Sequence, residues 1–453
     1  MAGMANLKIS MIGAGSPGFS MAVAEDLVRS KVLREASFVL MDVDPERLAK
    51  SEQNIRAMAA REKSPLKIST TLDRRAALAG CNYIVTACET KRLPYWIKDI
   101  EIPRRHGVAQ TLGENGGPGG QFHAMRNITM FMDICRDIRE LCPDAWLMNF
   151  TNPMSYLCTY FERAGGVNWL GFCHQVHGSF GVVAEVLGYE PGELEVISGG
   201  VNHFNWLVDI RRRGSNRSFM KEFLEQVRKS DFWRKNRPNV PQQQFTRDVL
   251  DTFGAYPVGY DDHVAEYLPW FYPPEEWEAR GYEWKTVSLN KWLAKPVSAT
   301  PTDTLSAVEP DRAVAKEKPP FPKDTTHPYY RERTCVVMEA FETNTPTYLD
   351  AINIINHGSI PNLPANAVVD IPAVAVGGRV RGIQVGELPV ACAELCRRQV
   401  TLHELVVQAT LTGDRQLALQ AMCLQPQIRS LTQARAIFDD LMKEYAAELP
   451  QFR

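Results

Sequence analysis

The chain has 453 residues, of which 45% are hydrophobic and 23% are charged, a balance typical of a globular protein with a large core and two or three domains. Its formal net charge of −2 and the lack of a dense basic run exclude nucleic acid and anionic membrane surfaces as expected partners. No apolar segment is long enough to span a membrane, and the first six residues lack the parts of a signal peptide. With ten scattered cysteines, which fit a reducing compartment, we expect a cytoplasmic protein.

A glycine-rich turn follows the first apolar segment, which covers residues 8–12. The turn reads Gly-Ala-Gly-Ser-Pro-Gly over residues 13–18 and leads into a predicted helix over residues 17–30. In this pattern Gly13 permits a tight turn, Gly15 lets the backbone approach a pyrophosphate, and Gly18 lets the helix pack on the strand. The N–H groups at the start of the helix then face the phosphates. The segment therefore predicts a dinucleotide site.

A second apolar segment, residues 36–41, ends at Asp42. An acidic residue at this distance from the glycine turn accepts hydrogen bonds from the ribose hydroxyls of NAD and repels the 2′-phosphate of NADP. The acid therefore favours NAD as the cofactor.

Strands and helices continue to alternate through the first half of the chain. We predict strands over residues 83–87, 146–150 and 169–172 and a helix over residues 122–141. This alternation predicts a doubly wound α/β domain with a Rossmann-like parallel sheet, similar to that of lactate and malate dehydrogenases, over residues 1–190. Ligands of such sheets bind beyond the carboxyl ends of the strands, where this chain carries Thr86–Arg92, Thr151–Pro153 and Cys173–His174.

The pattern changes after about residue 190, and we predict an α+β domain over residues 191–453 for substrate, metal and oligomer contacts. Residues 205–211 have the composition of a strand, residues 301–328 predict a long loop, and residues 387–448 have helical apolar spacing that is interrupted around Pro426.

Cys173 and His203 are the residues best suited to a metal. A thiolate and an imidazole together suit Zn, Fe, Co, Ni or Mn, with water or substrate completing the coordination shell. The thirty positions between them do not form a recognised ligand spacing, and from spacing alone a buried cysteine with an ordinary histidine is the better-supported interpretation.

Taken together, the motifs resemble glycoside hydrolase family 4, the NAD- and metal-dependent glycosidases. The segments that resemble those of the family are the turn at 13–18, Gly-Pro-Gly-Gly at 117–120, Asn-Phe-Thr-Asn-Pro at 149–153, Cys-His at 173–174, Val-Asn-His at 201–203, Tyr-Asp-Asp-His at 260–263 and the segment 356–364.

The resemblance implies that Cys173 and His203 bind a divalent metal, usually Mn²⁺. It also implies that Asn152 contacts the sugar hydroxyls beside the metal, and that Glu114 hydrogen-bonds the sugar or positions the nicotinamide. The implied reaction oxidises the sugar at C3, removes the proton at C2, eliminates the aglycone, adds water and finally reduces C3 again. This route differs from the usual pair of glycosidase carboxylates and explains why a hydrolase carries an NAD site.

The base and the acid are chosen among residues close to these motifs. The family uses a tyrosine in some members and an aspartate in others near residue 260. We choose Asp261 because a carboxylate is ionised at neutral pH, with Tyr260 as the alternative. For protonation of the leaving group we choose His174, because it follows Cys173 and histidine titrates near neutrality.

The sugar is predicted from the residues that follow Cys173. Gln175 and His177 carry no negative charge that would repel an anionic sugar, so the first choice is an α-galacturonidase. An α-glucosidase, α-galactosidase or α-glucuronidase of the same family is the alternative. The alternative from another class of enzyme is an NAD-dependent dehydrogenase of a hydroxy acid. It fits residues 1–150 alone but gives Cys173 and His203 no function. The resemblance further implies a homodimer or homotetramer.

Overall fold

The strands of the first half form one parallel sheet in the computed structural model, which describes residues 7–230, 243–282, 331 and 333–453. The order in the sheet is β3-β2-β1-β4-β5-β6, with all pairs parallel. This order is that of the dinucleotide-binding doubly wound fold, so the predicted fold class is confirmed for this half. The strands are β1 (Lys8–Ile12), β2 (Ser37–Met41), β3 (Lys67–Thr71), β4 (Tyr83–Thr86), β5 (Trp146–Asn149) and β6 (Asn168–Gly171).

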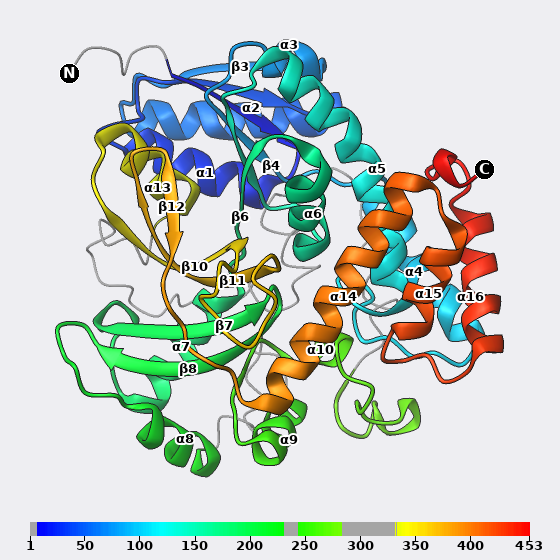
Figure 1. Ribbon diagram of the computed structural model, residues 1–453. Helices are drawn as coiled ribbons and strands as arrows, with labels where there is room; N and C mark the ends of the chain where they lie inside the picture. The colour runs from blue at the N-terminus through cyan, green and yellow to red at the C-terminus, as the bar shows by residue number, and fades with distance from the viewer. Residues whose placement is uncertain (1–6, 231–242, 283–330, 332) are drawn as a thin grey trace.

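Helices connect these strands (Figure 1). They are α1 (Pro17–Arg29), α2 (Pro45–Arg61), α3 (Arg74–Leu78), α4 (Arg92–Arg105), α5 (Gly117–Leu141), α6 (Met154–Tyr160) and α7 (Gln175–Leu187). The predicted helix at 122–141 begins five residues earlier, at Gly117. Glycines oppose helix formation by themselves, but a Cβ at Gly119 would lie 2.7 Å from the Asp99 carbonyl oxygen of α4. Close packing of α5 on α4 therefore requires a glycine at position 119.

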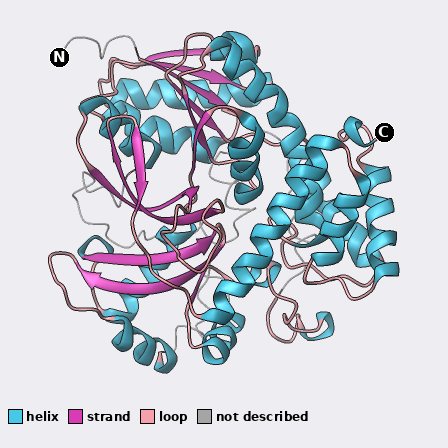
Figure 2. Ribbon diagram, viewed as in Figure 1, coloured by secondary structure: helices cyan, strands magenta, loops and turns pink. Residues whose placement is uncertain are grey.

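The sheet continues into the second half through antiparallel strands (Figure 2). The order after β6 is β10-β11-β7-β8-β9, and β12 pairs with β11. These strands are β7 (Leu194–Val201), β8 (Phe204–Arg212), β9 (Pro257–Val258), β10 (Thr347–Ile355), β11 (Val368–Val376) and β12 (Arg379–Gly382). The predicted boundary at residue 190 lies between α7 and β7.

The helices of the second half are α8 (Met220–Lys229), α9 (Gln244–Phe253), α10 (Asp261–Glu266), α13 (Arg333–Thr343), α14 (Val390–Thr412), α15 (Arg415–Leu424) and α16 (Leu431–Glu444). The last three confirm the predicted helices with a break near Pro426, and they pack on α4, α5 and α6 of the first half. The predicted loop at 301–328 lies outside the described residues. Among the described helices, none is long and apolar enough to cross a membrane.

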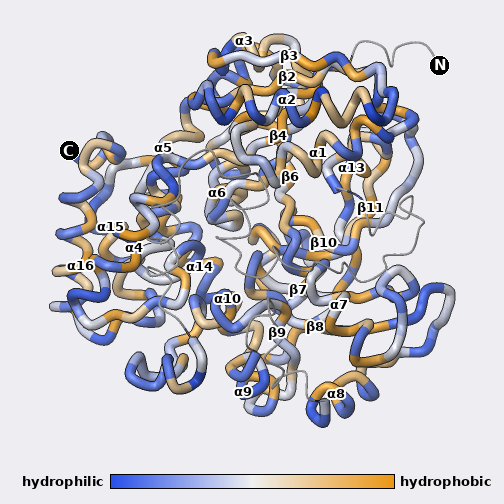
Figure 3. Tube along the Cα trace, turned by 180° about the vertical axis from the view of Figure 1, so that it is seen from behind, coloured by the Kyte–Doolittle hydropathy of each residue, from blue (hydrophilic) through white to orange (hydrophobic). Residues whose placement is uncertain are grey.

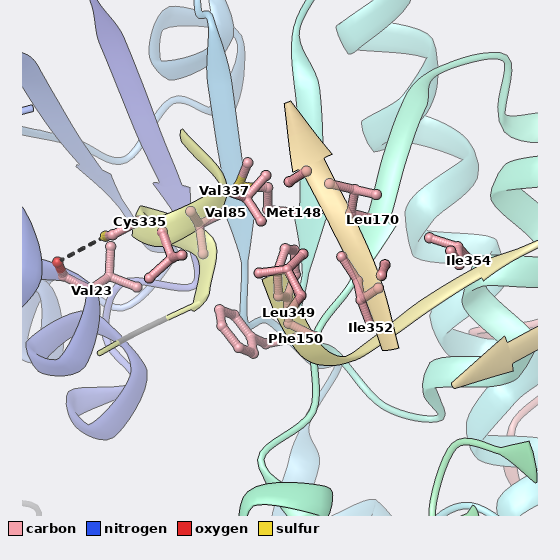
Figure 4. Close-up of a cluster of buried hydrophobic side chains, with 14 of the residues drawn as sticks. Val23, Val85, Met148, Phe150, Leu170, Cys335, Val337, Leu349, Ile352 and Ile354 are labelled. Atoms are coloured by element: carbon pink, nitrogen blue, oxygen red, sulfur yellow. Dashed lines mark hydrogen bonds between the residues drawn. The ribbon is translucent and has the colours of Figure 1, made fainter. Parts of the chain in front are cut away.

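Both faces of the central parallel strands β1, β2, β4 and β5 are buried, which explains why these four strands are mostly apolar, whereas the edge strand β3 is polar and partly exposed. Alternate residues along a strand belong to different cores: Met11, Val85 and Met148 face one hydrophobic cluster, whereas Ile84 and Leu147 face the other. Figure 3 shows hydrophobic residues gathered along these strands. The first cluster extends to α13, where Cys335 donates a hydrogen bond to the Val23 carbonyl of α1 at 3.7 Å (Figure 4).

Gly171 joins the parallel and antiparallel parts of the sheet, because it pairs with Asn353 of β10. A Cβ at Gly171 would lie 2.6 Å from the Cys158 sulfur and 2.8 Å from the Met154 sulfur and the Asn353 Cβ. We expect Gly171→Ala to lower the free energy of unfolding by about 1–3 kcal/mol, because the surrounding side chains must move. Denaturant unfolding measures this change.

The matched control is Gly181→Ala. Gly181 lies inside α7, and a Cβ added there would have no heavy atom within 4 Å, so this change should stabilise the protein by about 0.5–1 kcal/mol. Equal effects of the two substitutions would contradict the close packing at Gly171.

Candidate active site

The glycine turn lies at the carboxyl end of β1, held against the end of β2. Gly13 and Ala14 donate backbone hydrogen bonds to the Met41 carbonyl at 2.9 and 3.0 Å. Gly13 has φ +89°, and a Cβ there would lie 2.3 Å from the Ala87 carbonyl oxygen. Only glycine fits this position. Gly18 is the second residue of α1, whose first N–H groups have no partner within the helix.

Asp42 follows the last residue of β2 and stabilises the glycine turn. Its carboxylate accepts hydrogen bonds from the backbone N–H groups of Gly15 at 2.7 Å and Asp44 at 3.0 Å. The turn and the carboxylate thus form one unit, and this contact adds a structural role to the role that the sequence predicted for Asp42. The N–H groups at the start of α1 are donors for a pyrophosphate and the Asp42 carboxylate is an acceptor for ribose hydroxyls, so the arrangement fits a dinucleotide.

Cys173 and His203 meet although thirty residues separate them. Cys173 follows β6, and His203 lies in the two-residue turn between β7 and β8. The Cys173 sulfur and the His203 Nε2 are 3.0 Å apart. Burial opposes ionisation of the thiol, but the attraction to His203 and their hydrogen bond outweigh it and lower the pKa of Cys173. The pair therefore offers a sulfur and a nitrogen that can bind the same divalent ion.

The backbone of His203 is strained, since its φ is +63°, which few residues other than glycine adopt. Neighbouring contacts hold this turn. The Asn202 amide donates to the Asp370 carboxylate at 3.2 Å, and the Asn202 backbone N–H donates to the Ser155 hydroxyl at 3.2 Å. Burial raises the pKa of Asp370 to about 6. Such strain is typical of functional sites, where the surrounding structure enforces it.

Among the described residues, no group of three or more His, Cys, Asp or Glu side chains is arranged to hold a metal ion. A metal on Cys173 and His203 would therefore complete its shell with other oxygens, such as those of water or a sugar. This donor set fits an ion with exchangeable positions, as a metal that binds substrate requires.

Asp261 and Tyr260 are adjacent in sequence but face different elements. The Asp261 carboxylate accepts hydrogen bonds from the backbone N–H groups of Phe245 (3.1 Å) and Thr246 (2.7 Å), the Thr246 hydroxyl (2.6 Å) and the Tyr282 hydroxyl (2.6 Å). It therefore binds the start of α9. Burial raises its pKa to about 6 although these donors favour the charged form.

Tyr260 extends instead toward α7. A Cβ at Gly178 of α7 would lie 3.4 Å from the Tyr260 hydroxyl oxygen, which places that oxygen over the first turn of the helix. Tyr260 also lines a pocket together with Gln175, Gly178 and Gly259. The Tyr260 hydroxyl therefore lies beside α7 and next to this pocket.

The ring of His174 is part of an aromatic stack beside the glycine turn. Its centroid lies 5.6 Å from that of Phe150 and 5.9 Å from that of Phe19, with interplanar angles of 18° and 21°. Stacking fixes the plane of the imidazole. Asn152 follows β5, and its carbonyl accepts a hydrogen bond from the Asn127 amide at 2.7 Å.

Glu114 belongs to a buried charged cluster that follows β4. Arg92 binds both Glu114, at 3.1 Å, and Glu89, and Glu89 also pairs with His123. Although burial favours the neutral carboxyl, Arg92 and His123 lower the pKa of Glu89 to about 2. The guanidinium of Arg92 is thus already neutralised by two carboxylates.

Sequence reasoning missed His263 and Glu266. The Glu266 carboxylate accepts hydrogen bonds from the backbone N–H groups of Glu114 (2.6 Å), Asn115 (2.9 Å) and Gly116 (3.3 Å), just before α5. The His263 ring lies between this carboxylate and His203, with ring centroids 4.3 Å apart. Burial opposes the charge, but Glu266 and Asp262 raise the pKa of His263 to about 9. The dense ionisable segment at 260–266 was the only sequence signal.

Comparison with known proteins identifies the family to which the chain belongs. The model described as family 4 glycosyl hydrolase matches residues 8–189, and that of its C-terminal domain matches residues 198–428. An α-galactosidase of Rhizobium meliloti is 31% identical over 99% of this chain and 90% of its own length. An α-glucosidase of Erwinia rhapontici is 30% identical over 92% of each chain. An α-galacturonidase of Bacillus subtilis is 28% identical over 96% of this chain and 97% of its own.

Solved structures share the fold. A putative glucosidase lplD from Bacillus subtilis is 25% identical, with a TM-score of 0.78, over 96% of this chain and 100% of that chain. A 6-phospho-α-glucosidase from gut microorganisms in complex with NAD and Mn²⁺ is 21% identical, with a TM-score of 0.75, over 99% and 100%.

The burial of Asp261 predicts a pH dependence of stability. Because its pKa rises from 3.8 to about 6 on folding, the folded chain keeps this proton between pH 4 and 6 while the unfolded chain loses it. Its stabilising contribution is full below pH 4 and is lost as the pH rises through 6, by about 2–3 kcal/mol. The Asp261→Asn variant should not show this loss of stability between pH 4 and 6.

Denaturant unfolding at intervals from pH 4 to 7 measures the difference, with the exposed-carboxylate variant Asp133→Asn as the control. Parallel pH profiles for the wild type and Asp261→Asn would rule out the raised pKa.

Proposed function

Because the chain belongs to family 4 of the glycosyl hydrolases, we propose that it is an NAD- and divalent-metal-dependent α-glycosidase. The observation that carries the proposal is the 3.0 Å approach of the Cys173 sulfur to the His203 Nε2. Both residues lie beyond strand ends of the same sheet that carries the glycine turn. A plain dehydrogenase would use the turn but would give this pair no role.

The proposed cofactor residues are those of the glycine turn. The N–H groups at the start of α1, at Gly18, would receive the pyrophosphate, Gly13 and Gly15 would let it approach the turn closely, and Asp42 would accept the ribose hydroxyls. A structural neighbour solved in complex with NAD and Mn²⁺ supports the cofactor pair. When bound, NAD supplies reversible hydride acceptance at the sugar C3, and the metal on Cys173 and His203 polarises the C2 and C3 oxygens.

Tyr260 is our proposed base for the proton at C2. Asp261 was the first choice from the sequence, but its carboxylate is engaged by three donors at the start of α9 and by the Tyr282 hydroxyl. The Tyr260 hydroxyl lies beside Gly178 of α7, and α7 begins two residues after Cys173. A base must lie within reach of the proton that it removes, and Tyr260 meets this condition better.

The remaining roles follow the position of each side chain. His174 is the proposed proton donor to the leaving oxygen, since it adjoins Cys173 and stacking holds its ring. Asn152 and Glu114 are proposed to hydrogen-bond the sugar hydroxyls, because they follow β5 and precede α5 at the ligand-binding edge of the sheet.

We propose an unphosphorylated α-galactoside or α-glucoside as the substrate. Gln175, which first favoured a uronic acid, donates its amide hydrogens to backbone carbonyls, and Arg92 is neutralised by Glu89 and Glu114. Two relatives with 30–31% identity are named for these neutral sugars. An α-galacturonide is the second candidate, because Arg333 contacts the Cys173 carbonyl and His177 and a 28% identical relative carries that name.

The substrate and the mechanism can be tested together. Nitrophenyl α-galactoside, α-glucoside and α-galacturonide are incubated in deuterated water with NAD, Mn²⁺ and a thiol reductant, and the released sugar is examined by NMR. We expect hydrolysis of a neutral sugar with deuterium at C2, because the base exchanges that proton with solvent. Exclusive turnover of the galacturonide would reverse the choice of sugar. Accumulation of NADH with a hydroxy acid and no hydrolysis would point to the dehydrogenase.

The choice of base is tested by comparing Tyr260→Phe with Asp261→Asn. Loss of a general base should lower kcat of Tyr260→Phe by about 10²- to 10⁴-fold, with unchanged binding of NAD and Mn²⁺. Asp261→Asn should mainly lower stability, since its carboxylate binds α9. Steady-state kinetics below the unfolding temperature of each variant measure both effects. A larger loss of kcat in Asp261→Asn than in Tyr260→Phe would restore Asp261 as the base.

A further inference from the structure

Gln175, the first residue of α7, contacts the three segments that carry the proposed metal ligands and the proposed base. Its backbone N–H donates to the Cys173 sulfur at 3.5 Å. Its side-chain amide donates to the Val258 carbonyl at 2.8 Å and to the His203 carbonyl at 3.5 Å. We infer that Gln175 is a positioning residue for the metal ligands and for Tyr260. This inference rests on the proposed function.

The orientation of the Gln175 amide is determined by these contacts. Both of its neighbours are carbonyl oxygens, which accept hydrogen bonds only, so the nitrogen must face them. The amide also lies directly against Gly259, where an added Cβ would be 2.0 Å from the nitrogen. Gly259 precedes Tyr260, so the same close contact sets the path of the chain into Tyr260.

The position of Gln175 explains how the turn at His203 is restrained. Asp370 and Ser155 hold Asn202 on one side of the strained residue, and the Gln175 amide holds the His203 carbonyl on the other. Without this donor, the His203 carbonyl and the Val258 carbonyl lose a shared partner. The His203 imidazole would then be less strictly aligned with the Cys173 sulfur. The Tyr260 side chain would also be less strictly aligned with these two ligands.

A methionine has nearly the same length and volume as a glutamine but no donor, so Gln175→Met removes the amide contacts while keeping the packing. Gln433→Met is the matched control. Gln433 is also half-buried, near the start of a helix, and far along the chain from Cys173. Its amide donates to the His106 carbonyl at 2.8 Å and accepts from the Arg429 backbone N–H at 2.9 Å. Each variant therefore loses two side-chain hydrogen bonds to the backbone, and only Gln175→Met loses them at the proposed metal site.

The experiment measures the Kd for Mn²⁺ by calorimetry on the full chain without substrate, together with the Kd for NAD and the denaturation midpoint. Partners that orient metal ligands contribute roughly 10- to 100-fold to affinity. We expect Gln175→Met to raise the Kd for Mn²⁺ at least about tenfold with an unchanged Kd for NAD. Gln433→Met should leave both constants unchanged and shift the midpoint by a similar amount.

Kinetics at saturating Mn²⁺ separate the role toward Tyr260. Gln175→Met should retain a lowered kcat with little change in KM, because the base stays misaligned after the metal is bound. Wild-type affinity for Mn²⁺ together with wild-type kcat in Gln175→Met would overturn the positioning role alone. A wild-type chain that binds no Mn²⁺ would instead contradict the proposed metal site, and the inference with it.

Discussion

One row of paired residues across the sheet determines where the functional side chains lie. The row runs through Gly171, Asn353, Asp370, Gly200, Asn205 and Val258, each paired with the next. Cys173 stands two residues beyond one end of this row, and Tyr260 two residues beyond the other. His203 lies in the turn between Gly200 and Asn205. A slip of one residue at any pairing would turn the side chains of that strand to the opposite face, so the register of the row is the constraint on which the site depends.

The same row explains how so many polar groups are buried between two apolar cores. An isolated buried charge costs several kcal/mol, whereas a charge with matched partners is tolerated. Asp370 receives the Asn202 amide, and Glu266 receives three backbone N–H groups before α5. Asp370 thus accepts from a side-chain amide, and Glu266 accepts from backbone donors that would otherwise lack acceptors. The polar contacts hold loops in place, and the apolar clusters on each side exclude water from them.

Much of the parallel half could be predicted because its signals are local. A glycine turn after an apolar strand and an acid after the next strand are patterns of short range, and the helices and strands lie close to their predicted bounds. The start of α5 was not predictable, because glycines oppose a helix by themselves, and these glycines lie close to distant residues such as Asp99 and Gln110 that no local pattern shows. Cys173 and His203 were suggested by the family resemblance and not by spacing, since β10 and β11 lie between their strands in the sheet. His263 and Glu266 have partners about 60 and 150 residues away in the chain, which no local pattern reveals.

Tyr260 and Asp261 illustrate why the assignment of chemistry needs the fold. Both lie where α10 begins, and by sequence alone the carboxylate is the better base because it is ionised at neutral pH. The contacts of the two side chains in the fold are the reason why we propose Tyr260 instead. The Asp261 carboxylate is hydrogen-bonded to the start of α9. Its burial also disfavours the negative charge for which it was chosen as the base. The Tyr260 hydroxyl, in contrast, lies beside Gly178 of α7, next to a pocket. Reactivity is therefore a property of the position, and adjacent residues on one short helix can differ in it completely.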